Sequence, residues 1–313
     1  MEKYISYFKL RYNVALQYRT SAIAGMFTQF FWAIMQILIY IAFYKNSVGT
    51  NISLEQLISY VWLRQAFYSL INHVTDGEIK SSIENGNVAY ELIKPINLYW
   101  IWFSKTISSR IAACSIKCIP ILLIVPFMPG GINLDGPVSI EALILFVITL
   151  FIGMFIISAI INLFYISIFY TMSSKGTTSI FYGLLEFFGG GFIPIALMPS
   201  IWQKICYLLP VSLATDLPFR IYTGNIDLLE GVRYIGVQFI WIFVLVGLGN
   251  LFLNKILKKV VIQGGWNESI FKNNYNEYKI TAWIQKSIYN IYIWKFFSYI
   301  VVNSCGVFFI YEF

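Results

Sequence analysis

The apolar residues of this chain fall into long blocks and do not alternate with polar ones. Two of the blocks, 20–44 and 142–174, contain no Asp, Glu, Lys or Arg. A helix needs about 20 mostly apolar residues to cross the hydrocarbon core of a bilayer, so each block can span it. A membrane β-barrel would instead alternate apolar and polar residues over segments of about 10 residues. The sequence therefore predicts an all-α protein that crosses the membrane several times.

Polar segments divide the apolar sequence into six candidate membrane helices. The segments 45–55 and 75–97 are polar, and a Pro-Gly-Gly turn occupies 129–131. Glycine and proline clusters of this kind mark turns between regular elements. We therefore expect a six-helix membrane domain over residues 21–265. Its spans are expected at 21–44, 56–74, 100–128, 140–170, 178–189 and 234–254.

Residues 1–20 have the pattern of a basic amphipathic helix. Tyr4, Phe8, Tyr12 and Leu16 recur at the spacing of one helix face, with lysines and arginines around them. A helix of this kind lies in the membrane interface. The charged start and the long first apolar block also argue against a cleavable signal peptide.

The stretch after the fifth predicted helix is apolar but rich in helix-breaking residues. Irregular backbone at membrane depth is tolerated where protein or water satisfies its polar groups. We therefore expect a re-entrant or interfacial element in this region. The residues that define it are Gly189, Gly190, Gly191, Pro194, Pro199 and Pro210.

Residues 266–313 form a C-terminal extension whose role the sequence does not indicate. Its apolar part, 296–311, lies between Lys295 and Glu312. This part is shorter than the about 20 residues that a comfortable span requires. We expect it to lie in the interface, and a seventh membrane span is the alternative.

Composition and charge agree with a membrane location. Hydrophobic residues make up 58% of the chain and charged residues 12%, against about 25% charged in soluble domains. The net charge is +7, but the basic residues are spread over the ends of the apolar blocks, so we expect no nucleic-acid partner.

Excess Lys and Arg mark the cytoplasmic side of a membrane protein. We therefore expect a multi-pass protein of the cytoplasmic membrane with its N-terminus in the cytoplasm. The outer segments would then hold only Lys45, Lys204, Arg220 and Arg233.

Signatures of enzymes and metal sites are scarce. The chain has no Gly-x4-Gly-Lys-Ser/Thr phosphate-binding loop, so we do not expect it to hydrolyse ATP itself. His73 is the single histidine, and one histidine near a helix end is more typical of a structural hydrogen bond than of catalysis. Cys114 and Cys118 stand four residues apart but lack the further ligands of a zinc site. We expect no catalytic residue, metal or cofactor on this chain.

The polar segment 76–97 carries the most informative pattern. It reads as a short charged helix that closes at Asn85-Gly86, followed by a second turn that stops at Pro95. The segment is either an ordinary solvated loop or a docking helix on which a cytoplasmic partner pushes.

At this point the chain resembles the type-2 exporter permeases of the ATP-binding-cassette (ABC) transporters. Ile83, Gly86, Leu92 and Pro95 match the Ile-x-x-Gly-x5-Leu-x-x-Pro-like pattern of their first inner loop. After their fifth helix these permeases also carry glycine and proline motifs in short re-entrant helices at the outer face, similar to the stretch that begins at Gly189. The resemblance covers about residues 1–265.

The resemblance implies a function and partners. A separate cytoplasmic ATPase would bind ATP and magnesium, and a second copy of the chain or a sister permease would complete the transporter within the membrane lipids. The cargo would be amphipathic or hydrophobic, such as a drug, an antibiotic, a peptide or a lipid-like molecule, moved outward by alternating access. The coupling helix that the ATPase pushes on would be formed by Ile83, Glu84, Asn85, Gly86, Leu92 and Pro95.

Four charged residues fall at membrane depth, namely Arg64, Arg110, Lys117 and Glu186. Such residues cost several kcal/mol unless they are paired or hydrated, and they are candidates for function. We expect Arg110 to extend toward the interface along its aliphatic stem. Glu186, about one turn before the glycine run, is the candidate for lining a transport pathway, with an internal ion pair as the alternative.

Two functions of other classes stay open. A membrane-embedded lipid-linked transferase would need paired acidic residues or a histidine near one interface. The compact acidic pairs are Asp76 with Glu78 and Asp227 with Glu230, without an accompanying motif. An ATP-independent secondary transporter would be expected to show an internal repeat, and no clear repeat is seen.

Overall fold

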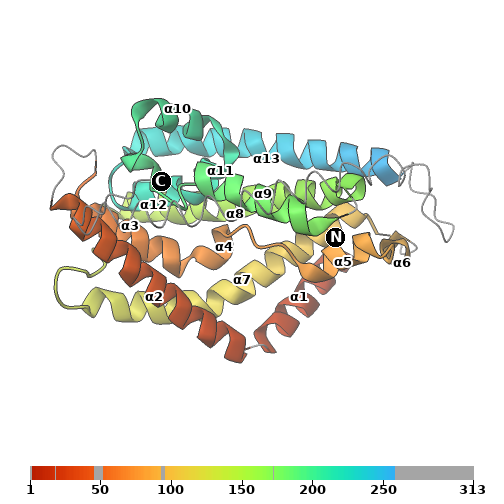
Figure 1. Ribbon diagram of the computed structural model, residues 1–313, viewed down its shortest axis with the longest axis horizontal. Helices are drawn as coiled ribbons and strands as arrows, with labels where there is room; N and C mark the ends of the chain where they lie inside the picture. The colour runs from red at the N-terminus through yellow and green to blue at the C-terminus, as the bar shows by residue number, and fades with distance from the viewer. Residues whose placement is uncertain (1, 18, 46–51, 93–95, 172, 258–313) are drawn as a thin grey trace, which may run out of the picture.

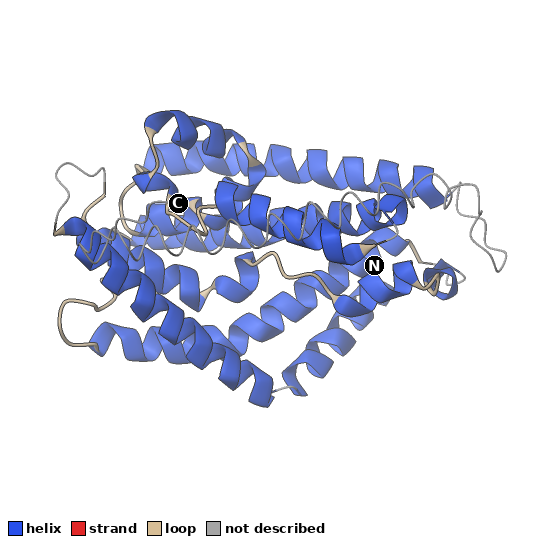
Figure 2. Ribbon diagram, viewed as in Figure 1, coloured by secondary structure: helices blue, strands red, loops and turns tan. Residues whose placement is uncertain are grey.

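The computed structural model describes residues 2–17, 19–45, 52–92, 96–171 and 173–257, and all regular structure in them is helical (Figures 1 and 2). The all-α prediction is therefore confirmed for this part of the chain. The C-terminal extension 266–313 lies outside the described residues, so its placement stays a prediction.

Within the part of the chain that the structure describes, four helices are long and apolar enough to cross a membrane. Each corresponds to one of the predicted spans, and its bounds differ from the predicted ones by at most six residues. Together they make the chain a multi-pass membrane protein. They are α2 (Arg19–Tyr44), α7 (Leu98–Ile124, continued by the 3-10 turn η1, Val125–Phe127), α8 (Ile140–Thr171) and α13 (Leu228–Leu257).

The second and fifth predicted spans take a different form. The second is divided into α3 (Leu54–Ala66) and α4 (Tyr68–Ile71), followed by non-helical backbone up to Asp76. The fifth is α9 (Ser174–Phe188), with 15 residues. At 1.5 Å per residue α9 covers about 22 Å, less than the about 30 Å of the hydrocarbon core. The prediction of six full spans is thus confirmed for four helices, and a continuous helix over 56–74 is wrong.

The helices run back and forth along the long axis of the molecule (Figure 1). The C-terminus of α8 and of α13 and the N-terminus of α7 lie at one end, together with α5 (Gly77–Glu84) and α6 (Val88–Leu92). We call this end the α5 end. The loop between α7 and α8 lies at the opposite end. Of the residues in the apolar part of α8, 72% are buried, against 11% in the apolar part of α2 and 17% in that of α13. Helix α8 is therefore the core, and the other two present apolar side chains outward.

Helix α1 (Glu2–Gln17) packs along α7. Tyr4, Tyr7 and Phe8 are half-buried against the core, and the hydroxyl of Tyr4 accepts a hydrogen bond of 3.1 Å from the backbone N–H of Asn97. The predicted aromatic face thus covers another helix, and the placement of α1 in a membrane interface stays a prediction.

Short helices follow α9, and prolines begin them. Pro194 and Pro199 are the residues before η2 (Ile195–Leu197) and α10 (Ser200–Leu208). Pro210 is the first residue of α11 (Pro210–Thr215), and Pro218 is the second residue of α12 (Leu217–Tyr222). Proline suits a helix start because its missing N–H would be unpaired there anyway. Helices α11 and α12 pack on α8, and the entry of this stretch into a membrane stays a prediction.

The contact between α8 and α11 is very close at Gly153. A Cβ added there would lie 2.8 Å from the carbonyl oxygen of Ala214 and 2.9 Å from its Cα. Both atoms belong to the backbone, so the two helices would have to separate to admit a side chain.

We predict that Gly153→Ala lowers the free energy of unfolding by about 1–3 kcal/mol, the usual cost of overpacking a core. Gly236→Ala on α13 is the matched control, because a Cβ there meets nothing within 4 Å and alanine favours a helix. Thermal unfolding of both purified variants checks this. An unchanged melting temperature for Gly153→Ala would contradict the close packing.

Candidate functional site

Helices α5 and α6 form a compact segment, residues 76–92, at the α5 end (Figure 1). The carboxylate of Asp76 begins α5 by accepting hydrogen bonds from the N–H groups of Glu78 (2.8 Å) and Ile79 (3.2 Å). The helix ends at Asn85, and Gly86 follows with φ of 73°. This left-handed conformation favours glycine, so Gly86 turns the chain from α5 into α6.

The α5–α6 segment has one buried and one exposed face. Ile79, Ile83 and Val88 are 0–2% exposed. On the other side Ser81, Asn85 and Asn87 are exposed, and Tyr90 is 72% exposed. The apolar residues of the α5–α6 segment thus face the protein interior, and its outer surface is polar and aromatic.

Acidic residues tie the segment to α1 and α7. Glu78 forms an ion pair of 3.1 Å with Arg11 of α1 and another with Lys105 of α7. Asp76 pairs with the same lysine at 3.0 Å. The bond to Lys105 and the nearby Arg11 lower the pKa of the Glu78 carboxyl below its usual value. The acidic pair that a transferase could have used is therefore engaged by two cations.

Further contacts tie the segment to α8 and α9. The N–H of Asp76 donates to the hydroxyl of Tyr165 in α8 at 2.7 Å. The carboxylate of Glu84 accepts a hydrogen bond of 2.5 Å from the N–H of Ser174, the first residue of α9. A carboxylate at this position satisfies a free helix N–H and is favoured by the helix dipole. The segment thus contacts four helices.

Not every residue of the predicted coupling pattern can be placed. Ile83 is buried, Glu84 caps α9, and Asn85 and Gly86 make the turn. Leu92 is the last residue of α6 and is half-buried against the core. Pro95 lies outside the described residues.

A buried charged cluster lies where α3, α4 and α9 meet. Glu186 of α9 is 6% exposed. Its carboxylate is 3.6 Å from the guanidinium of Arg64 and 3.2 Å from Nδ1 of His73. Arg64 also donates to the carbonyl of Gly191 at 3.3 Å. Glu186 therefore forms an internal ion pair with Arg64 and also contacts His73. Its role in a transport pathway stays a prediction.

The glycine run after α9 is required by its surroundings. Gly190 has φ of 72°. A Cβ at Gly189 would lie 2.6 Å from the carbonyl oxygen of Leu185, and one at Gly191 would collide with the carboxylate of Glu186. The run lets the backbone turn directly beside the charged cluster.

A second buried carboxylate, Asp216, was not singled out from the sequence. It is fully buried, accepts a hydrogen bond of 2.8 Å from the hydroxyl of Tyr60 and lies 3.7 Å from Arg220. An acidic residue in the apolar, proline-rich stretch between Pro210 and Pro218 was the available signal.

The expectation that Arg110 extends to the interface is wrong. This side chain is 5% exposed, and its guanidinium donates a hydrogen bond of 2.8 Å to the carbonyl of Leu70 at the end of α4. The Arg110 side chain therefore stays buried inside the helical domain, because the end of α4 leaves the carbonyl of Leu70 free to accept its hydrogen bond. Lys117, two turns along α7, is half-buried beside Gly25 of α2.

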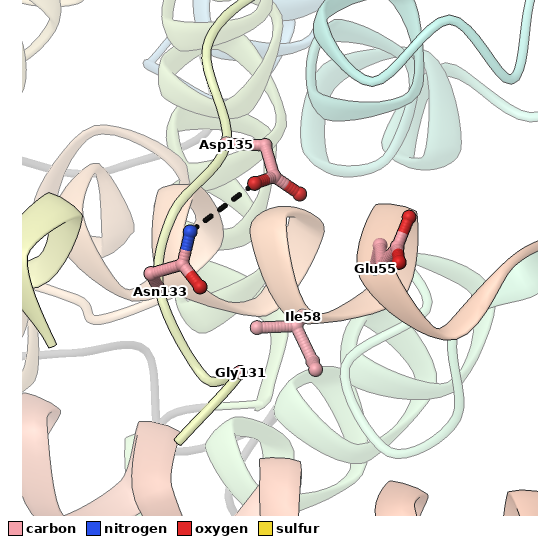
Figure 3. A pocket seen from close by; sticks show the side chains of 5 residues that line it. All are labelled: Glu55, Ile58, Gly131, Asn133 and Asp135. Atoms are coloured by element: carbon pink, nitrogen blue, oxygen red, sulfur yellow. Dashed lines mark hydrogen bonds between the residues drawn. The ribbon is translucent and has the colours of Figure 1, made fainter. Parts of the chain in front are cut away.

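A polar pocket of about 320 Å³ lies at the opposite end of the molecule (Figure 3). Glu55, at the start of α3, and the loop residues Asn133 and Asp135 line it, and the amide of Asn133 donates to the Asp135 carboxylate at 3.2 Å. Figure 3 shows the two carboxylates on separate elements. Within the described ranges, no three His, Cys, Asp or Glu side chains come together as metal ligands.

Long apolar helices that enclose buried ion pairs define a multi-pass helical membrane protein. The sequence pattern of the ABC-2 family transporter proteins matches residues 30–264, so the chain belongs to the ABC-2 transporter family. It is thus a membrane permease. No individual curated protein matches the chain. The match includes the α5–α6 segment and the buried charged cluster.

We predict that Glu186→Gln and Arg64→Gln each lower the free energy of unfolding by about 3–5 kcal/mol, because each leaves the other charge buried without its main partner. The double variant should lose less than the sum. Glu230→Gln, at an exposed position of α13, is the control. Thermal unfolding of the four variants measures the coupling, and additive losses would contradict the ion pair.

We predict a pH-dependent contribution from Glu78. Because its pKa is lower in the folded than in the unfolded protein, its ion pairs stabilise the fold above the unfolded value of about 4.3. This stabilisation is lost as the pH falls through the folded pKa. The Glu78 side chain is 65% exposed, so the effect is at most about 1 kcal/mol.

The difference in melting temperature between the native chain and Glu78→Gln tests this. It should be measurable at neutral pH and vanish below the folded pKa. A difference that is the same at both pH values would exclude a contribution from the charge.

Proposed function

We propose that this chain is the membrane-spanning subunit of an ATP-driven exporter whose ATPase is a separate polypeptide. In this proposal the α5–α6 segment is the docking element, and the α5 end with the N-terminus faces the cytoplasm of the cell. A second copy of the chain or a sister permease completes the transporter in the cytoplasmic membrane. ATP and magnesium bind to the partner ATPase.

The observation that carries the proposal is the bonding of the α5–α6 segment. Its outer face is polar and exposes Tyr90, while its inner face and its carboxylates contact α1, α7, α8 and α9. A solvated loop would need no such contacts. A push on the outer face would therefore be passed to four helices at once.

Helix α9 provides the direct route into the membrane domain. Glu84 holds its first residue, Ser174, and its far end carries Glu186 and the glycine run. Glu186 in turn contacts Arg64 of α3. A displacement of the α5–α6 segment would thus reach the buried charged cluster through one rigid helix of 15 residues.

The proposed cargo is an amphipathic or hydrophobic molecule such as a drug, an antibiotic, a peptide or a lipid-like compound. Alternating access would move it outward when the two ATPase subunits close on ATP. The short helices after α9 would form the gate at the outer face.

The partner can be identified by purifying the full chain from its native membrane in mild detergent with ATP, followed by mass spectrometry. Recovery of a soluble protein with a Walker motif and an ABC signature would support the exporter and show whether a second permease accompanies it. Its repeated absence would favour the secondary-transporter or transferase alternative.

We predict that Tyr90→Asp abolishes the stimulation of the partner's ATPase activity, because it places a charge in the exposed docking face. Gly136→Asp is the control, since it adds the same charge to an exposed loop at the opposite end, where a Cβ meets nothing within 4 Å. ATPase rates with each variant check the prediction. Equal stimulation by both variants would exclude docking at Tyr90.

A further inference from the structure

A cavity of about 230 Å³ lies beside the break between α4 and α5. It is lined by residues of α4, of the α4–α5 connection, of α7 and of α8. Arg110 lies 12 residues after the start of α7, which places it about 18 Å along the helix. Among the side chains that line the cavity are Ser69, Asn72, Thr106, Ser109, Arg110 and Tyr165.

Arg110 supplies the positive charge of this cavity. The side chain is 95% buried, and one terminal nitrogen donates to the carbonyl of Leu70. Its Nε has no hydrogen-bond partner. None of the ion pairs among the described residues includes Arg110. The guanidinium therefore has donors left for a ligand.

The carboxylates closest to this region are already paired. Glu186 is held by Arg64 and His73. Asp76, which also lines the cavity, is neutralised by Lys105. Within the described part of the chain, Arg110 therefore has no counter-charge. A buried charge without a partner costs several kcal/mol, and an anion in the cavity would offset this cost.

We propose that the cavity binds an oxyanionic group, a phosphate or a carboxylate, through Arg110. A guanidinium binds such groups by paired hydrogen bonds. The amide of Asn72 and the hydroxyls of Thr106 and Tyr165 add donors to the wall. About 230 Å³ accommodates a headgroup of a few heavy atoms but not a whole drug-sized ligand.

Lys117 is the next charged residue along α7, beside Gly25 of α2 and outside the lining of the cavity. It follows Arg110 by seven residues, so it lies on the same helix face about 10.5 Å further on. It too takes part in none of the ion pairs among the described residues. If the chain is the exporter proposed above, Arg110 in this cavity selects a cargo or bound lipid with an anionic headgroup. That extension rests on the proposed function, whereas the binding site itself does not.

A purely structural role for Arg110, holding the end of α4, must be separated from ligand binding. Ala113 allows this, because it lines the cavity one turn after Arg110 and is half-buried. Ala113→Glu would place a carboxylate beside Arg110 and occupy the site. Ala113→Gln has the same size without the charge, and both variants leave Arg110 and the carbonyl of Leu70 in place.

The test uses the full chain in phosphatidylcholine nanodiscs, titrated with inorganic phosphate in a calorimeter. We expect the native chain and Ala113→Gln to bind phosphate, and Ala113→Glu to bind at least about tenfold more weakly. Arg233→Gln, at an exposed position of α13, should bind like the native chain. A parallel arm replaces phosphatidylcholine with phosphatidylglycerol and detects retained lipid by native mass spectrometry.

The two arms distinguish the sources of the anion. Phosphate binding that depends on residue 113 supports a site for free anions. Retention of phosphatidylglycerol with the same dependence supports a lipid headgroup. Equal binding by Ala113→Glu and Ala113→Gln, or binding of neither probe, would overturn the proposal. No ATPase takes part, so these outcomes are independent of whether the partner of the proposed exporter is found.

Discussion

A bilayer offers no water to hydrogen-bond the ends of a broken helix, and this constraint shapes the centre of the molecule. Two elements stop inside the helical domain, at the end of α4 and at the end of α9. Side chains of neighbouring helices satisfy the freed backbone. Arg110 donates to the carbonyl of Leu70, and Arg64 donates to the carbonyl of Gly191. The hydroxyl of Tyr165 accepts from the N–H of Asp76. Arg64 and Arg110 are therefore part of the architecture, because they replace water at the breaks.

The same arrangement connects the two regions of functional interest. The α5–α6 segment begins directly after the break that follows α4, and its Glu84 holds the first residue of α9. The far end of α9 reaches the glycine run and the ion pair with Arg64. In the proposed exporter, a change at the polar outer face would thus act on both breaks. The cavity beside Arg110 lies at the first of them, so an anion bound there would lie next to the segment that the proposed ATPase moves.

The membership of the ABC-2 transporter family was recognised from weak motifs in the right order, and the match over residues 30–264 confirms it. Long spans were predicted with small errors, as the agreement of 140–170 with α8 (Ile140–Thr171) shows. The break near residue 67 and the non-helical stretch before Asp76 were missed, because this part of the sequence contains neither glycine nor proline. The hydrogen bond from Arg110 to the carbonyl of Leu70 was missed for the same reason, because an unbroken helix would leave no free carbonyl at that depth.

The sequence by itself determined that the chain is helical and membrane-spanning, and where its long helices lie, because hydropathy and the cost of exposing backbone in lipid act locally. It also determined the turn at Asn85-Gly86, since Gly86 takes a left-handed conformation that few other residues adopt. Only the tertiary structure decided which charges are paired. Arg64 and Glu186 are far apart in sequence. Asp216, between α11 and α12, accepts a hydrogen bond from Tyr60 of α3. Such pairings depend on how separate helices pack, which no local pattern encodes.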